Sequence, residues 1–106
     1  LDWRAHPAPP GGGFVMRESQ VEKHLAKRVA ALGGLCWKFV SPNLRGVPDR
    51  IVAMPEGRVF FVELKAPGEL PEPHQLRRHK ELRMCGCLVL VLDSTTAIDY
   101  WLEQFE

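Results

Sequence analysis

The chain has 106 residues, of which 45% are hydrophobic and 25% are charged. A chain this short forms one domain with a single modest core, which excludes separate binding and catalytic domains. The formal net charge is only +1, and no apolar run approaches the roughly 18 residues of a membrane-spanning helix. Three cysteines without zinc-type spacing are typical of free thiols, so we expect an intracellular protein without a membrane segment.

The chain opens with a segment rich in proline and glycine. Residues 1–15 are therefore predicted to be an unstructured leader, native or left over from expression, and residues 16–106 to be the folded domain. Apolar residues then recur at helical spacing from Val21 to Leu32. They predict an amphipathic helix over residues 18–32 that ends at the following pair of glycines.

Short apolar stretches separated by turn residues fill most of the remaining chain. The two stretches that flank the turn Pro55–Gly57 are apolar on both faces, and the last stretch is apolar throughout, which indicates a sheet covered on both faces. The predicted order is αβββαβα, an α/β domain with a mixed central sheet flanked by helices. The strands are expected over residues 35–40, 50–54, 58–64 and 87–92, and the later helices over residues 73–84 and 96–105.

The hairpin brings charged residues to one end of the sheet. If Pro55–Gly57 is a three-residue turn, Asp49 lies directly opposite Glu63, with Cβ atoms about 4.5–5.5 Å apart. Two carboxylates this close repel each other unless a cation lies between them or one is protonated. Lys65 shares a face with Glu63 because the two are two residues apart on a strand. The set predicts metal-assisted phosphodiester hydrolysis, and the alternative is a structural salt bridge from Lys65 to either acid.

A third acid lies on the first helix. The helical wheel places Glu18 at the N-terminal end of the face that packs on the sheet. A glutamate there is costly unless a partner satisfies it, so Glu18 is predicted to join the site. The alternative is a first-turn acid favoured by the helix dipole, and Glu22 could share or replace its role.

Three short motifs occur in order along the chain: GVPDR over residues 46–50, FVELKAP over residues 61–67, and His74–Gln75 at the start of a basic helix. Together they resemble the VRR-Nuc family of PD-(D/E)XK nucleases, over roughly residues 18–94. The resemblance implies a compact PD-(D/E)XK-like domain and a DNA endonuclease that uses Mg²⁺ or Mn²⁺. Lys65 then matches the catalytic lysine, and Gln75 matches a glutamine that tends to point toward the active site. The implied metal ligands are Asp49, Glu63, the main-chain carbonyl of Leu64, and Glu18.

Charge is distributed unevenly along the chain. Residues 16–84 hold 13 lysines and arginines against 8 acids, while the segment from Asp93 onward carries acids and no basic residue. This favours a nucleic-acid contact on one side, with an ordinary mixed surface as the alternative. The expected contacts to backbone phosphates are made by Lys38, Arg45, Arg50, Arg77, Arg78 and Lys80.

Two further predictions concern side chains outside this set. Trp37 is expected in the core of its strand, or else on the side that meets DNA. The histidines His24, His74 and His79 are expected to be surface or helix-packing residues, with proton transfer as the alternative.

The substrate follows from the resemblance alone. Small stand-alone family members resemble enzymes that resolve four-way (Holliday) junctions as homodimers, and one small active site cannot readily supply two paired cuts. We therefore expect a homodimer acting on branched DNA. The alternatives are a flap- or restriction-type nuclease with the same site, and a catalytically silent DNA-binding module.

Overall fold

The computed structural model describes residues 17–106, so the predicted leader lies outside the described residues. Three helices and a four-stranded sheet follow one another in the order αβββαβα, which confirms the prediction. No helix of this part of the chain is both long and apolar enough to cross a bilayer. The elements are α1 (Glu18–Ala31), β1 (Leu35–Lys38), β2 (Arg50–Met54), η1 (Pro55–Gly57), β3 (Arg58–Leu64), α2 (Pro73–Met84), β4 (Leu88–Leu92), α3 (Thr95–Leu102) and η2 (Glu103–Phe105).

The β2–β3 hairpin has the predicted register. Arg50 pairs with Val62, and Met54 pairs with Arg58, so the residues before β2 continue opposite the end of β3. The turn is tight because Glu56 and Gly57 both adopt positive φ, 71° and 76°. Asp49 therefore lies opposite Glu63, as the three-residue turn predicts.

The sheet has the strand order β1-β2-β3-β4, with antiparallel pairing of the first three strands and parallel pairing of β3 with β4. Parallel pairing needs a crossover, which α2 supplies. The amide of Lys65 continues this pairing beyond β3, because it donates to the carbonyl of Leu92 at 3.0 Å. The central strand β3 is thus fixed on both sides up to the residues that follow it.

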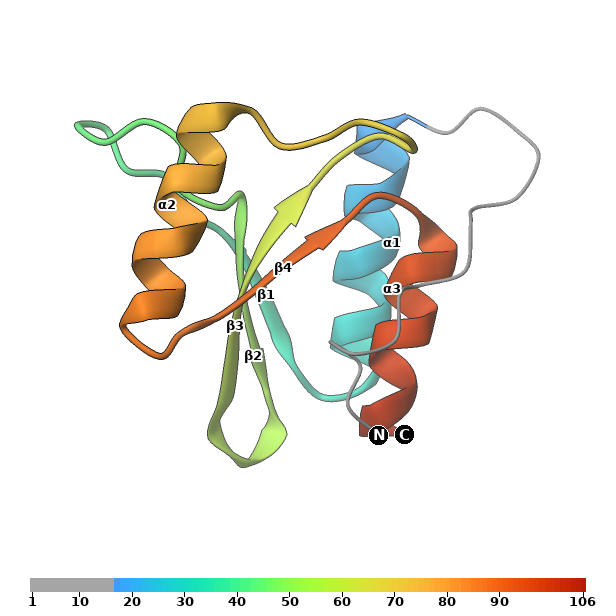
Figure 1. Cartoon of the computed structure of the whole chain (residues 1–106). Helices are drawn as coiled ribbons and strands as arrows, with labels where there is room; N and C mark the ends of the chain where they lie inside the picture. The colour runs from blue at the N-terminus through green and yellow to red at the C-terminus, as the bar shows by residue number, and fades with distance from the viewer. Residues whose placement is uncertain (1–16) are drawn as a thin grey trace.

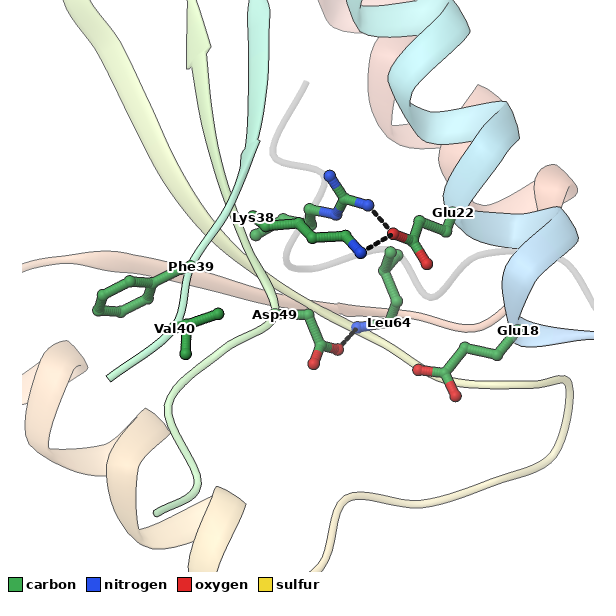
Figure 2. Close-up of a pocket in the computed structure, with 8 residues that line it drawn as sticks. Glu18, Glu22, Lys38, Phe39, Val40, Asp49 and Leu64 are labelled. Carbon is green, nitrogen blue, oxygen red and sulfur yellow. Dashed lines mark hydrogen bonds and ion pairs between the residues drawn. The ribbon is translucent and has the colours of Figure 1, made fainter. Parts of the chain in front are cut away.

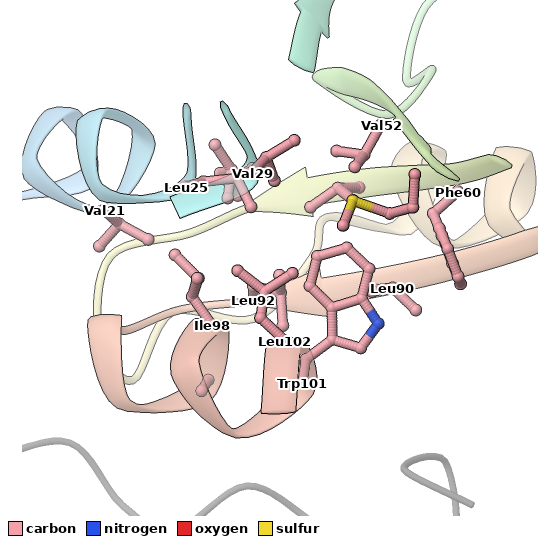
Figure 3. Packing of buried hydrophobic residues seen from close by; sticks show 14 residues of the cluster. Val21, Leu25, Val29, Val52, Phe60, Leu90, Leu92, Ile98, Trp101 and Leu102 are labelled. Atoms are coloured by element: carbon pink, nitrogen blue, oxygen red, sulfur yellow. The ribbon is translucent and has the colours of Figure 1, made fainter. Parts of the chain in front are cut away.

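The core lies between one face of the sheet and the helices α1 and α3, which run side by side on that face (Figure 1). Val21, Leu25 and Val29 of α1 are fully buried, as their helical spacing predicts. Figure 3 shows Trp101 of α3 among these side chains, with its ring centroid 5.1 Å from that of Phe60 in an edge-on arrangement. Aromatic contacts of this kind add to the burial of apolar area.

The other face of the sheet is only partly covered. The helix α2 lies on this side, near β4, and leaves much of β1, β2 and β3 open (Figure 1). Trp37 is 64% exposed, so its predicted place in the strand core is wrong, and Leu35 and Val59 on the same face are also exposed. Val91 of β4 is exposed as well, so β4 is not covered on both of its faces as predicted. A single 12-residue helix is too short to cover four strands.

Candidate active site

Two carboxylates meet where the hairpin ends. Asp49 precedes β2 and Glu63 is the penultimate residue of β3, and Glu63 is only 1% exposed. The amide of Leu64 donates to Oδ2 of Asp49 at 2.8 Å, which fixes the aspartate side chain across the strand pair. The hairpin register thus brings a half-buried aspartate next to a buried glutamate.

The raised pKa of Asp49 shows that it is unfavourable for Asp49 and Glu63 to be ionised together. Burial, the hydrogen bond to the Glu63 side chain and the negative charge of Glu63 raise the pKa of Asp49 from 3.8 to about 7. The Leu64 amide and the positive charge of Lys65 act in the opposite direction, but they are outweighed. Two ionised carboxylates are therefore unfavourable here, and a proton or a cation between them would relieve their repulsion.

The helix α2 supplies partners for Glu63. Nε2 of Gln75 donates to one carboxylate oxygen at 3.3 Å, and Nε2 of His79 lies 3.2 Å from the other. Gln75 is thus placed toward Glu63 as the sequence suggests. His79 is fully buried, so it is a helix-packing histidine rather than a surface one, and it makes a direct contact with Glu63.

Lys65 follows β3 and is 9% exposed. Within residues 17–106 its ammonium forms no ion pair with a carboxylate, so the alternative of a structural salt bridge is not observed. Its positive charge still acts on Asp49 and Glu18, lowering the pKa of each, which places it electrostatically within the same site. An ammonium without a close counter-ion remains available to an anion that binds beside it.

Glu18 and Asp49 line a pocket of about 200 Å³ between α1 and the hairpin end (Figure 2). Partial burial and the negative charges of Asp49 and Glu69 raise the pKa of Glu18, while Lys65 lowers it. Glu18 thus lies beside Asp49 at the N-terminal end of α1, but the burial that would have made a partner necessary is not found. Its side chain remains exposed to solvent at the pocket rim.

Glu22 lines the same pocket but has other partners. It forms an ion pair with the buried guanidinium of Arg50, and Nζ of Lys38 lies 3.8 Å from the same oxygen (Figure 2). Desolvation lowers the pKa of Arg50, and its ion pair offsets that cost. These contacts connect α1 to β2 directly beside Asp49.

The predicted phosphate-binding residues fall into two groups. Lys38 and Arg77 have side chains that are 73% and 75% exposed, and Arg45 and Lys80 are exposed as well. Arg50 is held by Glu22, and Arg78 donates to Glu81 at 2.7 Å. The exposed group has cationic ends that solvent, and hence a phosphate, can reach.

The donors available to a cation are hard oxygens. In the described part of the chain no three His, Cys, Asp or Glu side chains lie close enough to form a complete metal cage. Two carboxylates with a neighbouring main-chain carbonyl fit Mg²⁺ or Mn²⁺, because these ions keep several waters and need few protein ligands. The set does not fit structural zinc, which takes four protein ligands.

Sequence reasoning left the role of His79 open. Gln75 and His79 are one helical turn apart, at i and i+4, and therefore share a face of α2. A prediction that Gln75 points toward the site thus also places His79 beneath it. The missing information was that this face packs on β3 deeply enough to bury the imidazole.

Known proteins resemble the chain along most of its length, although no protein-family model matches it. Over 80 residues it is 56% identical to a protein named "Putative nuclease p44" from Acyrthosiphon pisum secondary endosymbiont phage 1, a match that covers 76% of this chain and 86% of that protein. A solved structure described as a VRR_NUC domain is 38% identical, with a TM-score of 0.79. That match covers 84% of this chain and 97% of the solved one.

Proposed function

The chain belongs to the VRR-Nuc family of nucleases, and from this premise we propose that it is a DNA endonuclease that needs Mg²⁺ or Mn²⁺ to hydrolyse phosphodiester bonds. One observation carries the proposal: Asp49 lies opposite the buried Glu63, and its pKa is raised to about 7. A protein without a cation to bind there would gain stability by replacing either acid with a neutral residue.

The cation would be held by Asp49, Glu63 and the main-chain carbonyl of Leu64, with Glu18 at the pocket rim. When bound, it would supply positive charge that polarises a phosphodiester and lowers the pKa of water. The two carboxylates already lie in place for it, because Glu63 is buried, Asp49 is half-buried, and the Leu64 amide fixes the side chain of Asp49. Little reorganisation is then needed when the cation binds.

Lys65 acts on the scissile phosphate in this proposal. Its ammonium stabilises the negative charge that develops on the phosphoryl oxygens, and its backbone is fixed by the hydrogen bond to Leu92. Gln75 keeps Glu63 in place from the α2 side. Glu18 lines the pocket together with Asp49 and lies within electrostatic reach of Lys65, and there it can orient water.

DNA would approach over the exposed cationic side chains. We assign phosphate contacts first to Lys38, Arg45, Arg77 and Lys80, because their side chains are exposed. Arg50 and Arg78 would have to give up close carboxylate partners before they could contact phosphate. The ion pairs of Lys38 with Glu22 and of Arg77 with Glu81 are longer, at 3.8 and 4.0 Å. Phosphate contacts position a duplex without reading its sequence, which suits recognition of DNA shape.

The proposed substrate is a four-way junction and the proposed active form is a homodimer. This part rests on the likeness to small junction-resolving family members and on the need for two paired cuts. Cleavage of matched four-way, flap and linear duplex DNA distinguishes the alternatives. Equal rates on linear duplex would contradict the junction proposal and favour a restriction-type activity.

The test of the chemistry uses a variant that keeps the shape of the site. Lys65→Met retains the aliphatic stem and removes only the charge, so DNA cleavage in Mg²⁺ should fall by at least about 100-fold, in keeping with the loss of one charge-stabilising group. The thermal midpoint should stay close to that of the unaltered protein, because the ammonium forms no ion pair among residues 17–106 that the substitution could break. Binding of junction DNA, measured by electrophoretic mobility shift, should be retained.

The matched control is Glu103→Gln, which alters an exposed acid in η2. It should cleave at the rate of the unaltered protein. If Lys65→Met and Asp49→Asn also cleave normally, the site is not catalytic, and the silent DNA-binding module becomes the better description.

A further inference from the structure

Both oxygens of the Glu63 carboxylate are contacted from α2. Gln75 reaches Oε2 at 3.3 Å, and His79 reaches Oε1 at 3.2 Å. Glu63 and His79 are both buried, so water does not compete for this second contact. Gln75 is only partly buried and cannot by itself fix the rotation of a carboxylate, because a group held at one oxygen can still turn about that contact.

The proton on the imidazole can be placed by its two nitrogens. A carboxylate without a proton only accepts hydrogen bonds, so Nε2 is the donor whenever Glu63 is ready to bind a cation. Nδ1 is buried, and no residue in the described part of the chain forms a hydrogen bond with it. The tautomer with hydrogen on Nε2 leaves only a lone pair without a partner at Nδ1, whereas the tautomer with hydrogen on Nδ1 would bury an N–H without an acceptor.

We propose that His79 is a positioning residue that fixes the Glu63 carboxylate in the orientation that binds a divalent cation with Asp49. The proposal rests on the function proposed above, because it concerns the same site. Each carboxylate oxygen that accepts one hydrogen bond from α2 keeps a second lone pair for a cation. Removing a residue that orients a metal ligand typically lowers metal affinity by about 10–100-fold.

Two amide variants separate the contact from the volume of the ring. His79→Gln places an amide nitrogen near the position of Nε2 and keeps the donor to Glu63. His79→Asn places its amide nitrogen near Nδ1, which has no hydrogen-bond partner among residues 17–106, and loses the donor. His79→Leu removes both nitrogens.

The readout is the affinity for Mn²⁺ alone, measured by isothermal titration calorimetry at pH 8. His79→Gln should bind Mn²⁺ within about threefold of the unaltered protein, while His79→Asn and His79→Leu should bind at least about tenfold more weakly. Cleavage by His79→Asn should recover when Mn²⁺ is raised, with an unchanged KM for DNA. A residue with only a packing role would shift the thermal midpoint of both amide variants without separating their Mn²⁺ affinities.

Glu63→Gln tells the two proposals apart. If the unaltered protein binds no Mn²⁺, or if Glu63→Gln binds as well as it does, the proposed metal site itself is wrong. If Mn²⁺ binding depends on Glu63 but His79→Asn and His79→Gln bind it equally, only the role of His79 is overturned.

A measurement on the unaltered protein covers the case in which a variant does not fold. The ¹⁵N shifts of the His79 imidazole should show hydrogen on Nε2, and these shifts should change in Glu63→Gln. A ring with hydrogen on Nδ1 alone would overturn the proposal, because Nε2 could then not donate to Glu63.

Discussion

Asp49 couples the site to folding through its proton. In the folded protein without a cation its pKa is about 7, against 3.8 for the free side chain. The folded state therefore keeps this proton between about pH 4 and pH 7, while the unfolded chain has released it. Stability from this group falls as the pH rises through that range and is constant above it.

We expect Asp49→Asn to remove this loss of stability at higher pH. In chelator, the free energy of unfolding of the variant should match that of the unaltered protein near pH 4 and exceed it above pH 7. Allowing for partial solvent screening, the difference should be on the order of 1–3 kcal/mol. Urea unfolding at a series of pH values measures it, and a difference that does not vary with pH would contradict the raised pKa.

Individual contacts were predictable to different degrees. The opposition of Asp49 and Glu63 follows from counting residues on either side of a three-residue turn, so local sequence was sufficient. The ion pair between Glu22 and Arg50 was not predictable, because it joins α1 to β2 and depends on how the helix is rotated over the sheet. The same holds for Arg83, whose guanidinium donates to the carbonyl of Val89 rather than facing solvent freely.

At the level of elements, the loop before β2 and the start of α2 pack closely. Gly46 has φ +91°, and a Cβ there would lie 2.5 Å from the carbonyl oxygen of His74. Gln75 follows His74 directly, so this contact fixes the first turn of α2, from which Gln75 reaches Glu63 of β3. The glycine is thus required both by its backbone conformation and by the close approach.

Gly46→Ala should therefore damage the site as well as the fold. It combines a left-handed backbone cost of about 1–2 kcal/mol with a clash against main chain that adds about 1–3 kcal/mol. The matched control is Gly68→Ala, where φ is +84° but no atom lies within 4 Å of the new Cβ. Thermal unfolding should show the larger loss for Gly46→Ala, and only this variant should bind Mn²⁺ more weakly.

The elements themselves were largely predictable. The bounds of β2, β3 and α2 are those expected, because glycine, proline and the change of hydrophobic period mark them in the sequence. How much of each face of the sheet is covered by helices was not predictable. An apolar strand face shows which residues could be buried, but it does not show whether a helix is long enough to bury them. Trp37 is the clearest case, since its strand was placed correctly and its environment was not.

For the whole molecule, the position of cationic side chains predicts how DNA binding responds to salt. Arg77→Ala combined with Lys80→Ala, in a Lys65→Met background that prevents cleavage, should remove two phosphate contacts. The slope of log K against log salt concentration should then become less steep by about 1.8. Lys23→Ala combined with Lys27→Ala removes the same charge from the exposed side of α1 and should leave the slope unchanged. Equal changes in both variants would indicate attraction by net charge alone.

The two neighbours of β3 are reached by very different lengths of chain. β2 is connected through the three residues of η1, whereas β4 follows only after a loop and the whole of α2. Closing the short turn costs less chain entropy, so the hairpin is expected to form before β4 docks. The two carboxylates therefore come together early in refolding, before α2 brings His79 beneath Glu63. A divalent cation at neutral pH should consequently speed folding, and not only slow unfolding. The reason is that the two carboxylates already repel each other in the transition state for folding, where the cation relieves that repulsion.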